Sequence, residues 1–180
     1  MRRSLPAFVT TLAVFATGCL EFGKVDDAKQ PGDLLGVYNV AARLEQSSCG
    51  PGILGASESW HFQVKLSRFA HDLYWLNGRE AIVGSIAKDG RSFSFETGIE
   101  VDIPVDQGGD PDCRIARDDI AEGKLSDDGT AVESFEGTLS FSYHPLDAST
   151  CESWLLTPDA PARLPCSIAY SMDATRVATE

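Results

Sequence analysis

From residue 36 onward, apolar residues recur mainly at every second position, which is the period of a β-strand with one buried face. The clearest example runs from Arg91 to Ile103, where five apolar residues and Thr97 alternate with polar residues or Gly98. A helix would scatter both sets around its circumference. The pattern predicts about eight strands, over residues 37–44, 59–69, 72–76, 80–87, 91–103, 113–125, 131–143 and 166–172.

Short turn sequences separate several of these strands. Asn77-Gly78 is a strong signal for a two-residue hairpin, and Lys88–Gly90 and Ser126–Gly129 have the composition of tight turns. Consecutive antiparallel strands joined by hairpins favour an all-β, up-and-down barrel, because closure removes exposed sheet edges. A two-sheet β-sandwich is the alternative.

The first predicted strand opens with Gly36-Val37-Tyr38, which resembles the Gly-x-Trp start of lipocalins, with Tyr38 in place of the tryptophan. The number and length of the strands are similar too. This resemblance implies a lipocalin-like barrel, and it raises the question of whether the interior holds an apolar ligand. A ligand carrier requires an internal cavity, whereas a structural barrel would be filled by Phe93, Phe95, Phe135 and Phe141.

The N-terminus has the pattern of a secretory signal. Arg2 and Arg3 form a basic head, and no charged residue occurs from Ser4 to Leu20. This apolar segment is shorter than the roughly 20 residues of a membrane-spanning helix, and it contains Pro6.

The segment Phe15-Ala16-Thr17-Gly18-Cys19 resembles the lipobox of bacterial lipoproteins, with Ala16 where Leu is usual. The resemblance implies cleavage between Gly18 and Cys19, and acyl chains on Cys19 that anchor the protein in a membrane. Two or three acyl chains keep a protein stably bound to a membrane, whereas a single chain gives only marginal binding. Leu20 follows the cysteine, which by the sorting rule of many Gram-negative lipoproteins favours the outer membrane, with the domain in the periplasm.

These observations divide the chain into three parts: a signal peptide over 1–18, a lipidated cysteine with a flexible tether over 19–35, and a single β domain over 36–180. The length of 180 residues suits one compact domain. The net charge of −12 argues against nucleic acid as a partner, because phosphate binding requires clustered Lys and Arg.

Four further cysteines, Cys49, Cys113, Cys151 and Cys166, suggest disulfides in an exported chain. No Cys-x-x-Cys spacing supports a zinc or redox site. Antiparallel strand order places all four at the same end of the barrel. Strand adjacency favours pairing Cys49 with Cys166 and Cys113 with Cys151. The rival pairing joins Cys49 with Cys113 and Cys151 with Cys166.

The sequence offers little catalytic chemistry. No nucleophile elbow, zinc-binding helix or phosphate loop is present, and His61, His71 and His144 fit surface positions. The acidic segment Asp106–Asp112 lacks the EF-hand order, so we interpret it as a solvated loop rather than a calcium site.

Two carboxylates and two tryptophans are further candidates for catalysis or binding. Asp118 and Asp119 are adjacent on a strand and should face opposite sides, which disfavours joint acid–base work. Trp60 and Trp154 are candidate aromatic contacts, with Trp60 expected in the core and Trp154 expected at an exposed surface.

The sequence therefore predicts a lipid-anchored, non-enzymatic lipoprotein of the bacterial cell envelope, without metal or cofactor and with no assigned role. The alternative is a lipocalin-like binding protein for a small apolar ligand.

Overall fold

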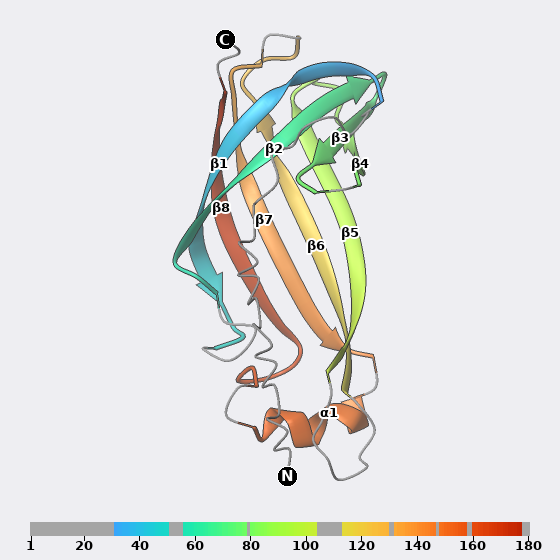
Figure 1. The fold of residues 1–180 in the computed structure, drawn as a ribbon, viewed down its shortest axis with the longest axis vertical. Helices are drawn as coiled ribbons and strands as arrows, with labels where there is room; N and C mark the ends of the chain where they lie inside the picture. The colour runs from blue at the N-terminus through green and yellow to red at the C-terminus, as the bar shows by residue number, and fades with distance from the viewer. Residues whose placement is uncertain are drawn as a thin grey trace, which may run out of the picture.

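The computed structural model describes residues 31–50, 56–78, 80–103, 113–129, 132–146, 148–157 and 160–177. These residues form a closed barrel of eight antiparallel strands in sequence order, with β8 beside β1 (Figure 1). The elements are β1 (Asp33–Ser47), β2 (Ser59–Phe69), β3 (Asp72–Leu76), β4 (Ile82–Ile86), β5 (Ser92–Ile103), β6 (Cys113–Leu125), β7 (Ser134–Pro145), α1 (Ala148–Leu155) and β8 (Cys166–Arg176). The predicted up-and-down barrel is confirmed, and closure excludes the sandwich.

The predicted strand bounds hold closely except at the first and last strands, which are longer than expected. β1 begins at Asp33, so residues 33–35, assigned to the tether, belong to the barrel. Leu35 is 1% exposed, and the Ser67 hydroxyl on β2 donates a hydrogen bond of 2.8 Å to the Pro31 carbonyl. The sequence pattern missed this start because a bulge between Leu34 and Gly36 breaks the period of two.

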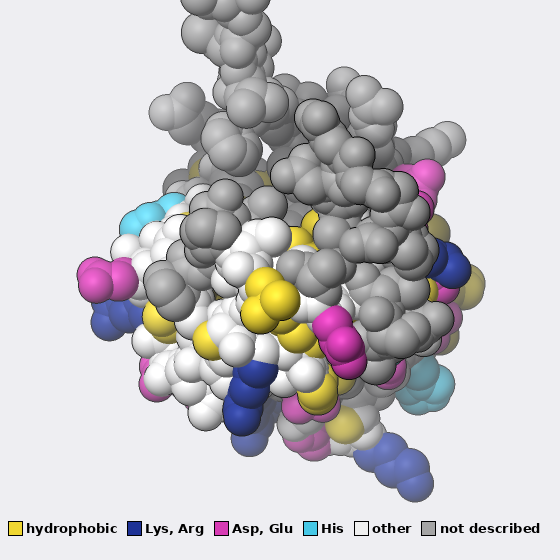
Figure 2. Space-filling model, turned by 90° about the horizontal axis from the view of Figure 1, so that it is seen from below, with side chains coloured by type: hydrophobic (Ala, Val, Ile, Leu, Met, Phe, Trp, Pro, Cys, Tyr) yellow, Lys and Arg dark blue, Asp and Glu magenta, His cyan; other side chains and the backbone are white. Residues whose placement is uncertain are grey.

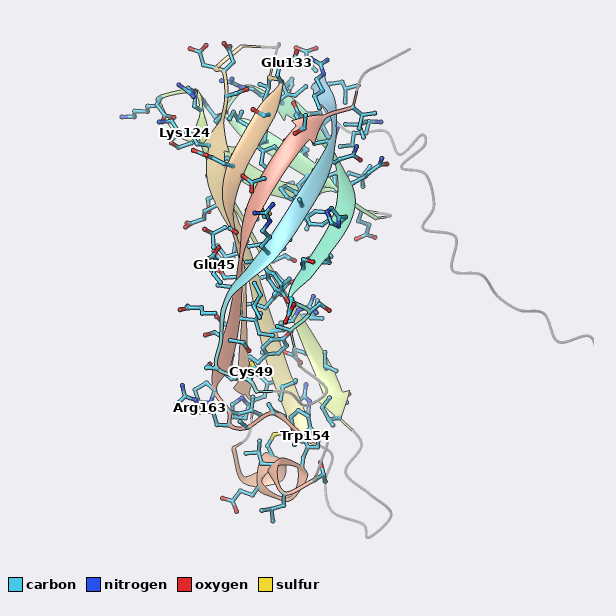
Figure 3. All side chains as sticks on the ribbon, turned by 90° about the vertical axis from the view of Figure 1, so that its left-hand side faces the viewer. Glu45, Cys49, Lys124, Glu133, Trp154 and Arg163 are labelled. Carbon is cyan, nitrogen blue, oxygen red and sulfur yellow. A yellow bond between two sulfur atoms is a disulfide. The ribbon has the colours of Figure 1, made fainter. Side chains whose placement is uncertain are left out.

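The two ends of the barrel differ. The tight turns at Lys88–Gly90 and Ser126–Gly129 lie at one end, which we call the turn end, and the four cysteines lie at the other, the disulfide end. Figure 3 shows Lys124 and Glu133 near the turn end, and Cys49 and Trp154 near the disulfide end.

The barrel is closed by strand pairing around its turn end only. β4 pairs with β5 at Phe93–Phe95, and β3 pairs with β2 at Lys65–Phe69. Residues Glu96–Ile103 of β5 pair with β6 on one edge, and residues Ser59–Val64 of β2 pair with β1 on one edge. Among the described strands, none pairs with the other edge of either segment. The short β3 and β4 therefore leave a seam in the half of the barrel nearer the disulfides, whereas the turn-end half is continuous.

Aromatic rings fill the interior at the turn end. The ring centroid of Phe135 lies 5.3 Å from Tyr38, 5.6 Å from Phe93 and 5.9 Å from Trp75. Trp75 lies 5.4 Å from Phe95 in turn. All five residues are buried, including three of the four phenylalanines expected to fill the core. Phe141, farther down β7, is half-buried and packs against the core cluster.

Two glycines make room for these rings. Gly123 on β6 lies directly opposite Gly137 on β7, on the inner face. A Cβ on Gly123 would lie 2.6 Å from the Phe93 ring and would also meet the backbone of Glu136. The sheet can therefore approach the Phe93 ring closely only where neither strand carries a side chain.

Tyr38 is fully buried, and its hydroxyl donates a hydrogen bond of 2.9 Å to the Val132 carbonyl. Burial raises the pKa of Tyr38 to about 12, from 10.0, with Arg176 opposing and Glu133 supporting the shift. The neutral phenol therefore contributes stability below pH 10 that is lost as the pH rises through about 12.

We expect Tyr38→Phe to lower the free energy of unfolding at neutral pH by about 1 to 3 kcal/mol, because the buried Val132 carbonyl loses its partner. The loss of stability from pH 10 to about 12 should be smaller in Tyr38→Phe than in the wild type. Urea unfolding at several pH values measures both effects. Tyr74→Phe, on the outer face, is the control and should keep the wild-type profile. Identical alkaline profiles for Tyr38→Phe and the wild type would show that Tyr38 does not carry the effect.

The disulfide end has a small core of its own. Cys49 bonds with Cys166 and Cys113 with Cys151, which confirms the pairing that strand adjacency favours. α1 packs against β6, and Trp154 lies with Cys113, Ile115 and Cys151 at 5% exposure. The expectation of an exposed Trp154 in a loop was wrong, because a helix turns the indole toward the disulfide.

Apolar side chains are also exposed at this end. Leu146 is 43% and Leu156 is 88% exposed. Figure 2, a view onto this end, shows hydrophobic side chains at the surface among acidic and basic ones. Within the described residues, no helix is both long enough and apolar enough to span a membrane.

Candidate functional site

The residues implied by the lipobox, Gly18 and Cys19, lie outside the described residues, as does the acidic segment Asp106–Asp112. The described residues contain no group of three or more His, Cys, Asp or Glu side chains able to hold a metal ion. The disulfide cysteines are buried and serve the fold.

The histidines lie where the sequence placed them, at the surface. His61 and His71 are exposed, and His144 on β7 lies 3.5 Å from the carboxylate of Asp118 on β6, on the outer face. Asp119, the next residue, faces inward, so the two carboxylates are on opposite sides of the sheet as predicted.

The inner face near the seam carries an ion pair that the sequence analysis did not identify. Arg117 donates from Nε and Nη2 to the two carboxylate oxygens of Asp119, at 2.6 and 2.7 Å. Both residues come from β6, two positions apart, so both side chains face inward. The side chains are 32% and 16% exposed.

Aromatic rings surround this ion pair. On β7, Phe141 lies under the guanidinium of Arg117, with 5.4 Å from Cζ to the ring centroid, and Tyr143 lies opposite Arg117 in the ladder. Tyr170 on β8 lies 6.2 Å from Phe141 between ring centroids. The arrangement places a planar cation on an aromatic face, which is a favourable contact.

β2 contributes two further rings across the inner face. Trp60 and Phe62 are stacked with centroids 4.6 Å apart, and Trp60 contacts Tyr170 at 6.1 Å. The indole Nε1 of Trp60 is buried and has no hydrogen-bond partner. An unpaired buried donor costs free energy, which a hydrogen bond to an acceptor atom would recover.

We define the inner-face cluster as the seven residues Trp60, Phe62, Arg117, Asp119, Phe141, Tyr143 and Tyr170. All of them lie in the half of the barrel that has the seam. Ile99 on β5, on the same inner face, is 44% exposed, while Phe93 and Phe95 on the same side of the strand are buried. The inner face is therefore accessible to solvent beside the cluster and closed at the turn end.

Electrostatics keep the cluster in fixed charge states around neutral pH. Burial lowers the pKa of Arg117, but the hydrogen bonds and charge of Asp119 outweigh it, and the net pKa is raised. Burial raises the pKa of Tyr143 against the opposing charge of Arg117. Burial also raises the pKa of Tyr170, opposed by a hydrogen bond from the backbone of Ser57. The cluster thus combines a hydrogen-bonded guanidinium–carboxylate pair with neutral phenols and ring faces, all of which a bound molecule can contact.

A sequence signal for Arg117 and Asp119 did exist. In the strand 113–125, they have the same parity as Ile115, Ala121 and Leu125, which face the interior. Two opposite charges on the apolar side of a strand indicate a buried pair. The sequence analysis compared Asp119 with Asp118 instead, and so missed its partner.

A depression of about 420 Å³ lies at the turn end and is lined in part by Lys124, Glu136 and Asp173. It is open to solvent, and its lining carries both basic and acidic side chains on the outer face. The inner-face cluster is the stronger candidate because it combines aromatic faces with an unpaired buried donor.

Comparison with known proteins gave no match: no protein-family model, no curated protein and no solved structure matches this chain.

Proposed function

We propose that this protein is a non-enzymatic lipoprotein of the bacterial cell envelope, anchored through Cys19, whose barrel binds a small amphipathic molecule at the inner-face cluster. The observation that carries the binding role is the set of half-buried aromatic rings around the Arg117–Asp119 pair, beside a seam in the strand pairing. The lipobox resemblance at Cys19 supports the anchor.

The chemistry of the cluster favours a ligand of a particular kind. Ring faces of Trp60, Phe62 and Phe141 suit an apolar or planar body. The Nε1–H of Trp60 is a donor in need of an acceptor, and Asp119 occupies two of the five donors that a guanidinium carries. Because Arg117 and Asp119 neutralise each other, a neutral molecule with hydroxyl or carbonyl groups fits better than an ion.

The filled turn end limits where a ligand can lie in the lipocalin-like alternative. In that half the rings of Tyr38, Trp75, Phe93 and Phe135 contact one another and occupy the interior. The proposed ligand therefore lies in the seam half and not in a deep central calyx.

Intact mass spectrometry of the protein purified from bacterial membranes tests the anchor. The expected product begins at Cys19, carries added acyl mass, and has four thiols that alkylate only after reduction. A chain cleaved elsewhere and free of lipid would overturn the anchor while leaving the binding role open to its own test.

A matched pair of variants tests the binding role. Ile99→Asn places an amide on the inner face beside the cluster, and Ile120→Asn places the same amide on the outer face of the neighbouring strand β6. Each variant is reconstituted in lipid nanodiscs and titrated with N-phenyl-1-naphthylamine, a neutral apolar amine. Emission excited through the three tryptophans reports probe bound to the protein, the matched variants locate it, and empty nanodiscs give the background.

We expect the wild type to give a saturable signal. Ile99→Asn should lower the affinity for the probe by about tenfold, since burying an unpaired amide against the ligand costs about 1 to 3 kcal/mol. Ile120→Asn should bind like the wild type. No saturable signal, or equal loss in both variants, would contradict binding at the inner face.

A further inference from the structure

The outer wall of the barrel has an unexpected apolar region on β1–β4. Leu34, Tyr74 and Val83 lie in one row across the strands with Ser67 between them, and Phe69 lies two residues along β2 on the same face. Leu34, Phe69 and Val83 are 53%, 62% and 56% exposed. We define the outer apolar patch as Leu34, Phe69, Tyr74 and Val83. Ser67, within the row, is 2% exposed and donates a hydrogen bond to the Pro31 carbonyl, so the exposed apolar side chains lie on either side of it. Several exposed apolar residues gathered on one face mark an interaction surface, whereas single ones do not.

The opposite wall has a different character. The outer faces of β5–β8 carry many carboxylates and few cations: Glu96, Glu100, Asp102, Asp118, Glu122, Glu136 and Asp173 against Arg114 and Lys124. On the outer faces of β2, β3 and β4, Asp72 is the one acidic residue. One wall of the barrel thus carries the apolar patch with almost no carboxylates, and the opposite wall is acidic.

The segment that leads to the anchor enters the barrel beside the patch. The Pro31 carbonyl accepts a hydrogen bond from Ser67, which lies in the row between Leu34 and Tyr74. Gly32 has a φ of +78°, and a Cβ there would collide with the backbone of Arg68 and lie 2.8 Å from the Cβ of Phe69. This close approach fixes the point at which the chain leaves the barrel.

The length of the connecting segment limits how far the patch can be from a bilayer. Residues 20–30 separate Cys19 from Pro31. A flexible tether of that length, as the polar composition of the segment predicts, would span about 20 Å, whereas a strand as long as β6 extends about 40 Å toward the disulfide end. Acyl chains on Cys19 would therefore hold the turn end near the membrane and the disulfide end farther away.

We propose that the outer apolar patch rests on the lipid bilayer in which Cys19 is anchored, so that the acidic wall and the disulfide end face away from it. This inference rests on the proposed lipid anchor. A bilayer is the occupant that the tether length and the charge distribution favour, because apolar side chains gain free energy in the interface and carboxylates are repelled by anionic lipid.

Photocrosslinking of the full-length lipidated protein in its own membranes tests the orientation. The photoreactive residue p-benzoylphenylalanine replaces Phe69 or Val83 in the patch, and Leu156 in a control at the disulfide end, where exposure is 88%. Mass spectrometry identifies the adducts after ultraviolet irradiation. At position 69 the new residue keeps the phenyl ring of Phe69 and adds a benzoyl group at an exposed site, and position 83 provides a second test if one variant folds poorly.

We expect several-fold more phospholipid adduct at positions 69 and 83 than at 156. Adducts with a second copy of this chain or with another protein at 69 and 83, in place of lipid, would overturn the proposal, as would equal lipid adducts at all three positions. The intact mass of the same samples separates the two proposals. Acylated protein without lipid adducts at the patch refutes the orientation alone, whereas protein without acyl mass refutes the anchor and with it the orientation.

Discussion

Replacing Cys49 and Cys166 together by serine is expected to lower the free energy of unfolding by about 5 kcal/mol, because this bond closes a loop with a sequence separation of 117 residues. The bond also joins the segment after β1 to the start of β8, the pair of strands that closes the barrel. Urea unfolding followed by circular dichroism measures the change.

The second disulfide provides the matched comparison. Cys113 and Cys151 are separated by 38 residues, so replacing both by serine should cost about 4 kcal/mol, somewhat less than the first pair. Both variants should show a steeper dependence of stability on urea than the wild type, because an unfolded chain without the cross-link exposes more surface. A larger loss from the shorter loop would show that packing of α1 on the bond, rather than loop closure, determines its contribution.

Phe135→Ala is expected to lower the free energy of unfolding by about 3 to 5 kcal/mol, because it removes a buried ring and leaves a cavity. Phe135 is 3% exposed and contacts Tyr38, Trp75 and Phe93, so its loss affects several rings at once. Calorimetric or urea unfolding of the variant and of the wild type measures the difference.

Phe69→Ala is the control for this prediction. Phe69 is 62% exposed on the outer face, so its removal should change stability by less than about 0.5 kcal/mol in detergent. Equal losses from the two variants would mean that the rings at the turn end do not act as a core.

Much of the fold could be read from the chain because strand pattern and turns are local properties. The predicted ranges for β2, β3 and β6 agree with the structure, and the turns at Lys88–Gly90 and Ser126–Gly129 lie where their composition indicates. The position of the cysteines at one end follows from antiparallel order alone. The start of β1 was missed because a bulge breaks the alternation there.

The candidate site was predicted only in part. The period of two placed Trp60 on the inner face, where it packs against the core cluster, half-buried and with an unpaired Nε1. The same period placed Asp119 and Asp118 on opposite faces, but it did not reveal the pairing of Asp119 with Arg117. Trp154 was expected at the surface, but it is buried beside the Cys113–Cys151 bond.

The strands, the alternation of their inner and outer faces and the end that holds the cysteines follow from the chain alone, because each depends on neighbouring residues. How deeply each inward residue is buried depends instead on the tertiary structure, because other strands must close over it. Phe93 and Ile99 have the same parity on β5, yet one is 4% and the other 44% exposed. The difference arises because β4 pairs with the first part of β5 and ends before Ile99.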